Sequence, residues 1–373
     1  MKLKTIFKKV TAAALAATMV VGMAACGSGS ETASSSDSAA SSSGTEAAAT
    51  PAVTDNSKIK IGVSIWSSTD VLGSQCKLIL DAAADALGVE VQYVDQGHVS
   101  EKVTASVEQL VAAGCQRIIS ETNSADIYQA AKDSAYYIGA VHEDEPANGE
   151  ALVNILLDKG DRDIGLIGWE QGDATWLGRW EGYKAGVDKW NEAHPDDPAQ
   201  LSEPQYAGTT SEGGSKAAEA LMAADPNLDA LIPAGGGGDP LQGAIAAVER
   251  AGKTQDIDIV STDFLPDLGD RLENGSMAGE SGGHYCDPLI AFMMVYNAIK
   301  GNYTGFAGNF EDVSFPYLYV SSAEDYQAYE KYFVDQLPYT SDELVEMSNL
   351  DLSALKEAAK NISIEDAASR AGN

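Results

Sequence analysis

The chain has 373 residues, and its 24 basic and 56 acidic side chains give a formal net charge of −32. A body this acidic repels phosphate backbones and anionic headgroups, which argues against nucleic acid or a peripheral membrane surface as a partner. The length is sufficient for two compact lobes of ordinary size.

The first 25 residues have the pattern of an export signal. Four lysines precede a stretch of apolar and small residues from Val10 to Val21, and further small residues lead to Cys26. The pattern resembles the bacterial lipoprotein signal, in which cleavage precedes lipidation of the cysteine. An ordinary secretory peptide with a chance cysteine is the alternative, but both predict an exported protein. The lipoprotein interpretation places the protein outside the cytoplasm, anchored to the cell membrane through Cys26.

Residues 26–57 are predicted to be a disordered tether. They consist largely of Ser, Ala, Thr and Gly. A segment with so few large apolar side chains cannot bury enough surface to offset the entropy lost on ordering. A flexible tether directly after a lipidated cysteine would hold a folded body near a membrane surface, so it supports the lipoprotein interpretation.

From residue 58 onward, apolar strand patterns alternate with amphipathic helix patterns. The run KIKIGVSIW at 58–66 predicts a strand, and Leu72, Cys76 and Ile79 recur at helical spacing in the next segment. Short connections between such elements indicate a parallel, doubly wound sheet. Further strands are predicted at 89–94, 117–121, 164–168, 205–207, 228–233, 257–262 and 310–320, helices at 70–87, 101–113, 149–159, 179–192, 215–223, 241–251 and 288–300, and a helical tail at 321–373.

Four features of the body carry a family resemblance, and the first is the opening strand and helix with Trp66 and Asp70. The turn RWEGY at 179–183 follows a buried strand, the run DALIPAGGGGDPLQGAIAAVERAG occupies 229–252, and IDIVSTDF at 257–264 places an acid after an apolar strand. Their order and spacing resemble the ribose-binding-protein family, the type I periplasmic sugar-binding proteins. The resemblance implies an α/β fold of two doubly wound parallel-sheet lobes joined by a hinge. The implied first lobe is 58–143 plus 284–312, and the second is 144–283 plus 313–373.

The first lobe departs from the family pattern between Gly114 and Tyr137. The family fits a strand, a full helix and a further strand ending in an Asp-Arg ligand pair there, whereas this stretch has room for one strand and one helix. One α/β unit needs about 30 residues. The first lobe is therefore predicted to be short by about one unit, which affects the ligand contacts that it can supply.

The resemblance also implies a ligand held between the lobes by residues at strand ends. Asp70 matches a polar ligand residue, Arg179 the ligand arginine of the second lobe, and Asp263 the ligand acid. An acid and an arginine can each bond two sugar hydroxyls, and hydrogen bonds to charged groups are the stronger kind. The apolar face of a pyranose stacks on an indole. The predicted ligand residues are Trp66, Asp70, Trp176, Arg179, Asp239, Asp263 and His284.

Most of these residues have a plainer interpretation. Asp70 could cap the helix that follows it. Arg179 could pair with Asp173 or Glu181 on the surface. The two tryptophans could belong to the core, since Trp is commonly buried, and His284 could be a loop histidine.

The glycine run at 235–238 follows a strand and precedes a helix, which is the setting of a nucleotide loop. It lacks both the third glycine of a dinucleotide fingerprint and the Gly-Lys-Ser/Thr of a P-loop. It is therefore expected to let the backbone turn tightly or approach a ligand. The family often has an asparagine at the position of Gly237, and Asp239 is the candidate to replace it.

The reactive residue types give no sign of catalysis or metal binding. Besides Cys26 there are Cys76, Cys115 and Cys286, an odd number that argues against a disulfide framework. No CxxC or His-x-x-x-His spacing exists for zinc, and none of the four histidines lies in a nucleophile motif. No enzyme activity, cofactor or metal is expected.

The hypothesis that results is a monomeric, extracytoplasmic solute-binding lipoprotein that delivers a monosaccharide-like ligand to an ABC-type permease. Ligand binding would shift the population toward a closed form that the permease recognises. The alternatives are a nucleoside or signalling molecule as ligand on the same scaffold, a ligand sensor for a membrane kinase, an enzyme, and a degenerate chain that binds nothing.

Overall fold

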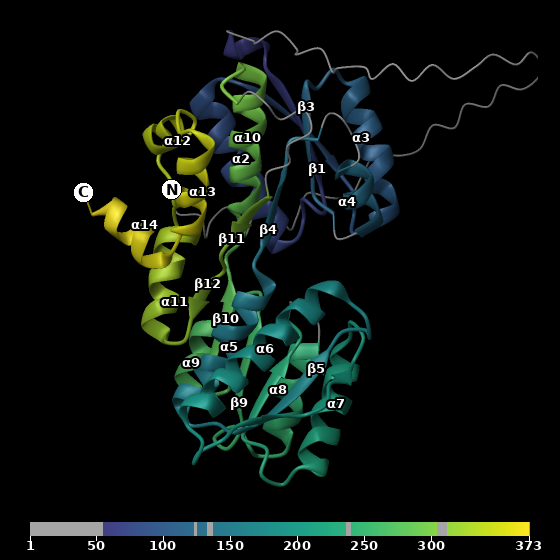
Figure 1. Ribbon diagram of the computed structural model, residues 1–373, viewed down its shortest axis with the longest axis vertical. Helices are drawn as coiled ribbons and strands as arrows, with labels where there is room; N and C mark the ends of the chain where they lie inside the picture. The colour runs from purple at the N-terminus through teal and green to yellow at the C-terminus, as the bar shows by residue number, and fades with distance from the viewer. Residues whose placement is uncertain (1–54, 123–124, 133–136, 236–239, 304–311, 373) are drawn as a thin grey trace, which may run out of the picture. The chain divides into compact units, whose positions relative to one another are not determined.

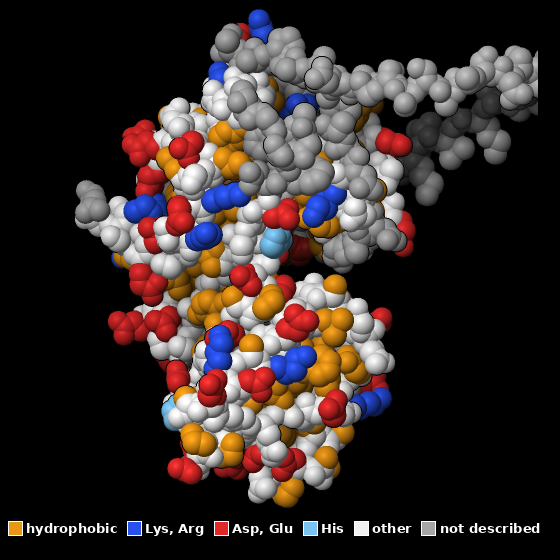
Figure 2. All heavy atoms as spheres, in the orientation of Figure 1, with side chains coloured by type: hydrophobic (Ala, Val, Ile, Leu, Met, Phe, Trp, Pro, Cys, Tyr) orange, Lys and Arg blue, Asp and Glu red, His pale blue; other side chains and the backbone are white. Residues whose placement is uncertain are grey.

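The computed structural model describes residues 55–122, 125–132, 137–235, 240–303 and 312–372 (Figure 1). All of them lie in one compact unit that runs from Thr50 to Asn373. The predicted export signal, Cys26 and almost all of the predicted tether fall outside these ranges. Acidic side chains are scattered over the visible face, in keeping with the net charge (Figure 2). No helix within the described ranges has the length and apolarity needed to cross a membrane.

The first sheet has the order β2-β1-β3, and its pairings are parallel. Its central strand β1 (Lys60–Ile65) is buried at five of six positions, as expected of a strand covered on both faces. Helix α3 covers the face of Ser64, whose hydroxyl lies 2.5 Å from that of Ser106, and α2 packs on the other face. The neighbouring elements are α2 (Val71–Leu87), β2 (Glu90–Asp95), α3 (Val103–Ala112) and β3 (Arg117–Ser120), with 3-10 turns at Asn56–Lys58 and Ser100–Lys102.

The largest sheet has the order β12-β10-β9-β8-β5-β6, and β7 also pairs with β5. Its pairings are parallel, except that β10 and β12 run antiparallel. One core lies under α5 and α6 on one face, and another lies under α7 and α8 on the other. The elements are α5 (Glu145–Lys159), β5 (Asp163–Gly168), α6 (Ala174–Ala193), β6 (Gln200–Leu201), β7 (Gln205–Tyr206), α7 (Ser211–Ala224), β8 (Ala230–Pro233), α8 (Pro240–Arg250), β9 (Asp258–Thr262), α9 (Leu268–Asn274), β10 (Gly279–Gly282) and β12 (Leu318–Val320).

A third, two-stranded sheet pairs β4 (Ala140–Glu143) with β11 (Asp312–Phe315) in parallel. It is separate from the β2-β1-β3 sheet, although α10 (Asp287–Lys300) packs against both β3 and β4. Between β3 and β4, the described chain contains only helix α4 (Ala125–Lys132). The interruption lies in the stretch where the sequence predicts the absence of one α/β unit.

The chain crosses three times between the elements of the two small sheets and the elements of the large sheet. The first joins β4 to α5, the second joins β10 to α10, and the third joins β11 to β12. Pro316 lies in the third connection, so the single strand predicted over 310–320 is divided into two. A proline cannot donate to a strand ladder, which accounts for the division.

The helical tail packs against both sets of elements. Helix α11 contacts α9, whereas α12 contacts α2, and α13 contacts α10 and β11. The predicted boundary assigned 313–373 wholly to the second lobe, so this arrangement differs from it. The reason is that α12 and α13 bury Leu344, Met347 and Leu355 in the core shared with α2 and α10. The tail consists of α11 (Ala323–Tyr329), a π-helical turn (Glu330–Val334), α12 (Ser341–Met347), α13 (Leu352–Lys360) and α14 (Ile364–Ala371).

The three cysteines within the described ranges are free thiols. Cys76 and Cys286 are buried, which agrees with the apolar pattern around Cys76, and Cys115 is partly buried. Burial raises the pKa of the thiols of Cys76 and Cys286, so both stay protonated and behave as small apolar side chains. The described residues hold no group of three side chains suited to binding a metal ion.

Candidate functional site

Arg179 lies on α6, and the packing of α6 against α5 decides where its side chain lies. Asp173 starts α6 by accepting a hydrogen bond from the backbone N–H of Trp176 at 2.8 Å. The two helices then approach so closely that a Cβ added to Gly182 would lie 2.1 Å from the carbonyl oxygen of Pro146. Because a side chain would not fit there, the glycine allows the first turn of α5 to lie against α6.

The guanidinium of Arg179 is held by Glu145, the first residue of α5. Its Nε donates to Glu145 Oε2 at 2.7 Å, and its Nη2 donates to Oε1 at 3.4 Å. The partner is therefore Glu145 and neither Asp173 nor Glu181. Arg179 is only 4% exposed, and its Nη1 has no hydrogen-bond partner among the described residues. A buried donor without a partner is costly, so this nitrogen is available to a ligand acceptor.

Tyr317 and His284, from the other two connections, complete the surroundings of Arg179. The Tyr317 hydroxyl accepts a hydrogen bond from Arg179 Nη2 at 3.3 Å and donates one to Glu145 Oε1 at 3.0 Å. The rings of His284 and Tyr317 meet edge-on, with centroids 4.9 Å apart. Within the described part of the chain, the buried Nδ1 of His284 has no partner. The structure thus brings two of the predicted ligand residues, Arg179 and His284, into one cluster.

Asp263 follows β9 and adopts a left-handed backbone conformation, with φ of 75°. Its N–H donates to the carbonyl oxygen of Ser281 at 2.7 Å, which ties the turn to β10. Non-glycine residues are uncommon in this region, and Asp tolerates it better than most. Burial alone would lower the pKa of Arg179, but Tyr317, Glu145 and Asp263 raise it. The charge of Asp263 therefore acts on the guanidinium of Arg179.

Asp70 caps α2 and also contacts a histidine. Its Oδ1 accepts a hydrogen bond from the Gly73 N–H at 2.7 Å, so the capping interpretation is confirmed. Its Oδ2 lies 2.8 Å from Nε2 of His98, whose ring meets the ring of Trp66 edge-on at 5.8 Å. His98 has a φ of 60°. Strained backbone of this kind clusters at functional sites, and His98 is a candidate ligand residue that no sequence pattern marked.

Glu121 is a second candidate that sequence reasoning missed. It follows β3, and its Oε2 accepts a hydrogen bond from the Trp66 N–H at 2.7 Å. Burial, with the charge of Asp70 nearby, raises the pKa of Glu121 to about 7. The sequence did contain a sign of this site, because Glu121 is an acid at the end of a predicted strand, just as Asp263 is.

Two carboxyl groups meet where the small sheets connect to the large one. Glu143 ends β4, and Asp287 begins α10. Burial and then the charge of Glu143 raise the pKa of Asp287. Burial would also raise the pKa of Glu143, but His284 and the hydrogen bond with Asp287 lower it. The proximity of the two carboxyl groups therefore raises the pKa of Asp287 and lowers that of Glu143.

Trp176 belongs to the core rather than to an open site. It is 1% exposed, and its ring packs against those of Trp180 and Tyr206, with centroids 5.4 and 5.8 Å away. The core interpretation therefore describes this residue, and a ligand could stack on its ring only after repacking. Trp169, in the loop between β5 and α6, is partly buried, and the guanidinium carbon of Arg179 lies 5.3 Å from its ring centroid. Trp169 is the loop tryptophan that lies beside the predicted ligand arginine.

Asp239 falls outside the described residues, as does the glycine run from 236 to 238. The proposed replacement of a ligand asparagine by Asp239 therefore stays a prediction. The preceding Gly235 is described, and a Cβ there would lie 1.7 Å from the carbonyl oxygen of Thr262. At least this first glycine is needed for close packing between the ends of β8 and β9.

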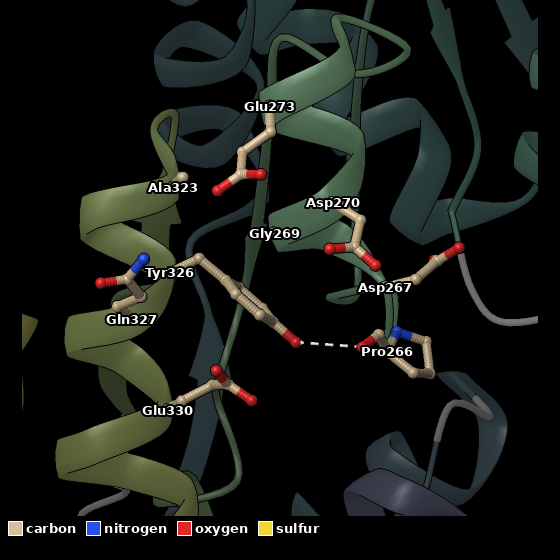
Figure 3. Close-up of a pocket in the computed structure, with 9 residues that line it drawn as sticks. All are labelled: Pro266, Asp267, Gly269, Asp270, Glu273, Ala323, Tyr326, Gln327 and Glu330. Atoms are coloured by element: carbon tan, nitrogen blue, oxygen red, sulfur yellow. Dashed lines mark hydrogen bonds between the residues drawn. The ribbon is translucent and has the colours of Figure 1, made fainter.

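A cavity of about 270 Å³ lies between α9 and α11, away from the residues described above (Figure 3). Its walls carry Asp267, Asp270, Glu273 and Glu330, and the Tyr326 hydroxyl donates to the carbonyl oxygen of Pro266 across it at 3.2 Å. None of the predicted ligand residues lines it. Asp267 is paired with Arg271 at 2.9 Å, and the other acids make this cavity an acidic recess, so the candidate site remains around Arg179.

The arrangement of the chain is shared with solved periplasmic solute-binding proteins. A D-allose-bound ABC-transporter protein from Actinobacillus succinogenes 130z matches with a TM-score of 0.60 at 16% identity, covering 73% of this chain and 100% of the other. A myo-inositol-bound protein from Bacillus halodurans C-125 matches at 0.59 and 19%, covering 74% and 99%. The arabinose-transporter protein from Shewanella sp. ANA-3, bound to L-arabinofuranose, matches at 0.56 and 19%, covering 80% and 98%.

Neither a protein-family model nor a curated protein sequence matches this chain. At identities below 20%, the likeness to the solved structures concerns the fold. The parallel sheets, the three connections between them and the full coverage of the other chains agree with the predicted fold class. This chain therefore has the type I periplasmic-binding-protein fold.

Proposed function

We propose that this chain is an extracytoplasmic solute-binding lipoprotein that captures a monosaccharide-like ligand and delivers it to an ABC-type permease. The observation that supports the proposal is the buried Arg179, whose Nη1 has no partner among the described residues and whose guanidinium is acted on by the charge of Asp263. Each hydroxyl of a sugar both donates and accepts. An arginine donor beside a carboxylate acceptor therefore matches a pair of neighbouring hydroxyls.

The proposed ligand residues are those predicted from the sequence, with one replacement and two additions. Trp169 takes the stacking role expected of Trp176, because Trp169 lies beside Arg179 and Trp176 is in the core. His98 and Glu121 are added, because they contact Asp70 and Trp66. The retained residues are Trp66, Asp70, Arg179, Asp239, Asp263 and His284.

The proposed mechanism is closure about the three connections. A ligand that bonds residues carried by both the small and the large sheets binds the closed form better than the open form. It can shift the equilibrium only by its difference in affinity for the two forms. Micromolar affinity requires about −8 kcal/mol. A few hydrogen bonds to charged groups, at about 1.5–3 kcal/mol each, together with one stacked ring are sufficient after ordering costs.

The membrane anchor and the permease rest on the sequence. The signal pattern before Cys26 and the polar tether after it support a body held near a membrane without being embedded in it. Metabolic labelling with palmitate tests the anchor. Label should enter the wild-type protein and be lost in Cys26→Ala, and labelling that persists in the variant would contradict lipidation at this residue.

Isothermal titration calorimetry of the purified protein against monosaccharides, inositols and nucleosides tests ligand capture. We expect a neutral sugar or polyol to bind, and Arg179→Ala to weaken that binding by more than about a hundredfold, or about 2.7 kcal/mol. The matched control is Arg250→Ala, because Arg250 is an exposed arginine paired with Glu219 at 2.8 Å in the same half of the molecule. Unchanged affinity in Arg179→Ala would show that the ligand binds elsewhere, and a nucleoside as the best ligand would favour the alternative ligand class.

A further inference from the structure

Tyr317 lies at the meeting point of the three connections. It separates β11 from β12, while Glu145 begins the helix after β4 and His284 precedes the helix after β10. Its hydroxyl is bonded to Glu145, and its ring contacts that of His284. One tyrosine therefore links all three segments on which opening and closing would depend.

The Tyr317 hydroxyl also bridges Arg179 and Glu145. It accepts from Arg179 Nη2 at 3.3 Å and donates to Glu145 Oε1 at 3.0 Å. Tyr317 and Arg179 are each 4% exposed, so water does not compete for these bonds. Burial raises the pKa of Tyr317, and the hydroxyl therefore keeps the proton that it donates.

These contacts leave one end of the guanidinium free. A guanidinium has five N–H donors in a rigid plane. Its Nε and Nη2 are engaged by Glu145 and Tyr317, whereas Nη1 has no partner among the described residues. Rotation of the guanidinium would break bonds to both partners, so the direction of the Nη1 donors is set by Tyr317 and Glu145 together.

The same contacts compensate the charge of the arginine. The carboxylate of Glu145 neutralises the guanidinium at 2.7 Å, and the charge of Asp263 acts on it as well. A ligand carboxylate or phosphate at Nη1 would thus gain little attraction from an arginine whose charge Glu145 already compensates, and the carboxylate of Asp263 would repel it. A neutral hydroxyl can accept from Nη1 without that repulsion.

We propose that Tyr317 and Glu145 are positioning residues that make Arg179 a donor to neutral hydroxyls and exclude anionic groups. The inference rests on the proposed function, since it assigns Arg179 to the ligand site. It narrows the ligand class to neutral sugars and polyols and excludes sugar acids and sugar phosphates.

Isothermal titration calorimetry on the full chain tests this inference. The neutral probes are D-glucose, D-galactose, D-allose, L-arabinose and myo-inositol, and the acidic probes are D-glucuronate and D-galacturonate. The wild type should bind its best neutral probe at least a hundredfold more tightly than its best acid. Glu145→Gln keeps the shape of the side chain and removes its charge, so it should reduce this ratio at least tenfold.

Tyr317→Phe should act differently from Glu145→Gln. It removes only the hydroxyl, so affinity for the neutral probe should fall at least fivefold while the ratio between probes stays near its wild-type value. The matched controls are Glu150→Gln, on the same helix and paired with Lys189, and Tyr319→Phe, a half-exposed tyrosine two residues along. Neither control should change affinity or ratio, whereas general destabilisation would move controls and variants alike.

The outcomes separate the two proposals. A wild type that binds none of the probes overturns the proposed sugar capture and this inference with it. A wild type that binds a neutral probe, with both variants unchanged, overturns this inference alone. A wild type that prefers an acid also overturns it, while leaving solute binding intact. If Glu145→Gln fails to fold, Tyr317→Phe decides the positioning role and the wild-type ratio decides the charge selectivity.

Discussion

Arg179 and Glu145 come from two neighbouring helices and form an ion pair, with Nε 2.7 Å from Oε2 and the arginine 4% exposed. The pair depends on the close packing of α5 and α6 at Gly182. The ion pair engages one side of the guanidinium and leaves Nη1 free. The proposed ligand contact of Nη1 therefore depends on the helix packing that places Glu145 beside Arg179.

The ion pair should make Arg179 matter for stability as well as for binding. Arg179→Ala leaves the partly buried Glu145 carboxylate with only the Tyr317 hydroxyl as a partner, and breaking a buried pair costs up to about 3–5 kcal/mol. The double variant Arg179→Ala/Glu145→Ala should be less destabilised than the sum of the two single variants. Urea unfolding of the wild type, the two single variants and the double variant measures the interaction free energy between the two side chains. Additive losses would show that the two side chains do not interact.

Gly182 should tolerate no side chain. In Gly182→Ala the new Cβ would lie 2.1 Å from the Pro146 carbonyl oxygen, so α5 and α6 must separate. Such overpacking typically costs about 1–3 kcal/mol, and the displaced Glu145 should also weaken ligand binding. Thermal unfolding and calorimetry measure the two effects. Glu181→Ala, at an exposed position on the same helix, is the control and should change neither.

Asp263 should show opposite effects on stability and on binding. Its φ of 75° suits glycine, so Asp263→Gly should relieve strain and leave stability equal or slightly higher, while Asp263→Ala should cost about 1 kcal/mol or more. Both variants remove the carboxylate and should bind the ligand at least tenfold more weakly. A stabilised glycine variant with wild-type affinity would contradict the assignment of Asp263 to the ligand site.

Glu280 should make stability depend on pH. It is fully buried in β10, its Oε2 accepts a hydrogen bond from the Leu265 N–H at 2.7 Å, and burial raises its pKa well above the usual range. The folded state therefore keeps a proton that the unfolded state loses above its ordinary pKa, so this residue makes stability fall as pH rises from there toward the raised pKa.

Glu280→Gln should remove that dependence. The variant should be more stable than the wild type at pH 7, by up to about 1.4 kcal/mol for each pH unit between the ordinary glutamate pKa and pH 7, and the gain should vanish near pH 4. Urea unfolding at the two pH values measures the difference. A gain of equal size at both would mean that protonation of Glu280 is not its cause.

The sequence predicted the fold well, because the fold depends on local patterns that the chain displays plainly. The apolar run before Trp169 is β5, and the helical spacing after Asp70 is α2. That only one helix fits between β3 and β4 was also predictable, since it is a matter of length. The packing of α12 against α2 of the first lobe was not predicted. The pattern of an amphipathic helix shows that one face is buried, but it does not show which elements that face packs against.

The site was harder to predict, because its partners are brought together only by the fold. Glu145 and Tyr317 are 172 residues apart, and nothing local marks either as a partner of Arg179. Trp169 and Trp176 are both loop-flanking indoles, and only the packing of Trp176 against Trp180 and Tyr206 shows which of the two is core. Asp263 was predicted because an acid at a strand end is a local feature.

A thermal-shift screen of the purified protein against neutral monosaccharides, inositols, nucleosides and sugar acids decides whether this chain captures a neutral sugar or polyol. A ligand at 100 times its Kd stabilises the folded state by about 2.7 kcal/mol, which raises the melting temperature by several degrees. We predict such a rise with at least one neutral sugar or polyol, none with the sugar acids, and loss of the rise in Arg179→Ala. A cooperative melt that no neutral sugar or polyol shifts would contradict capture of a monosaccharide-like ligand.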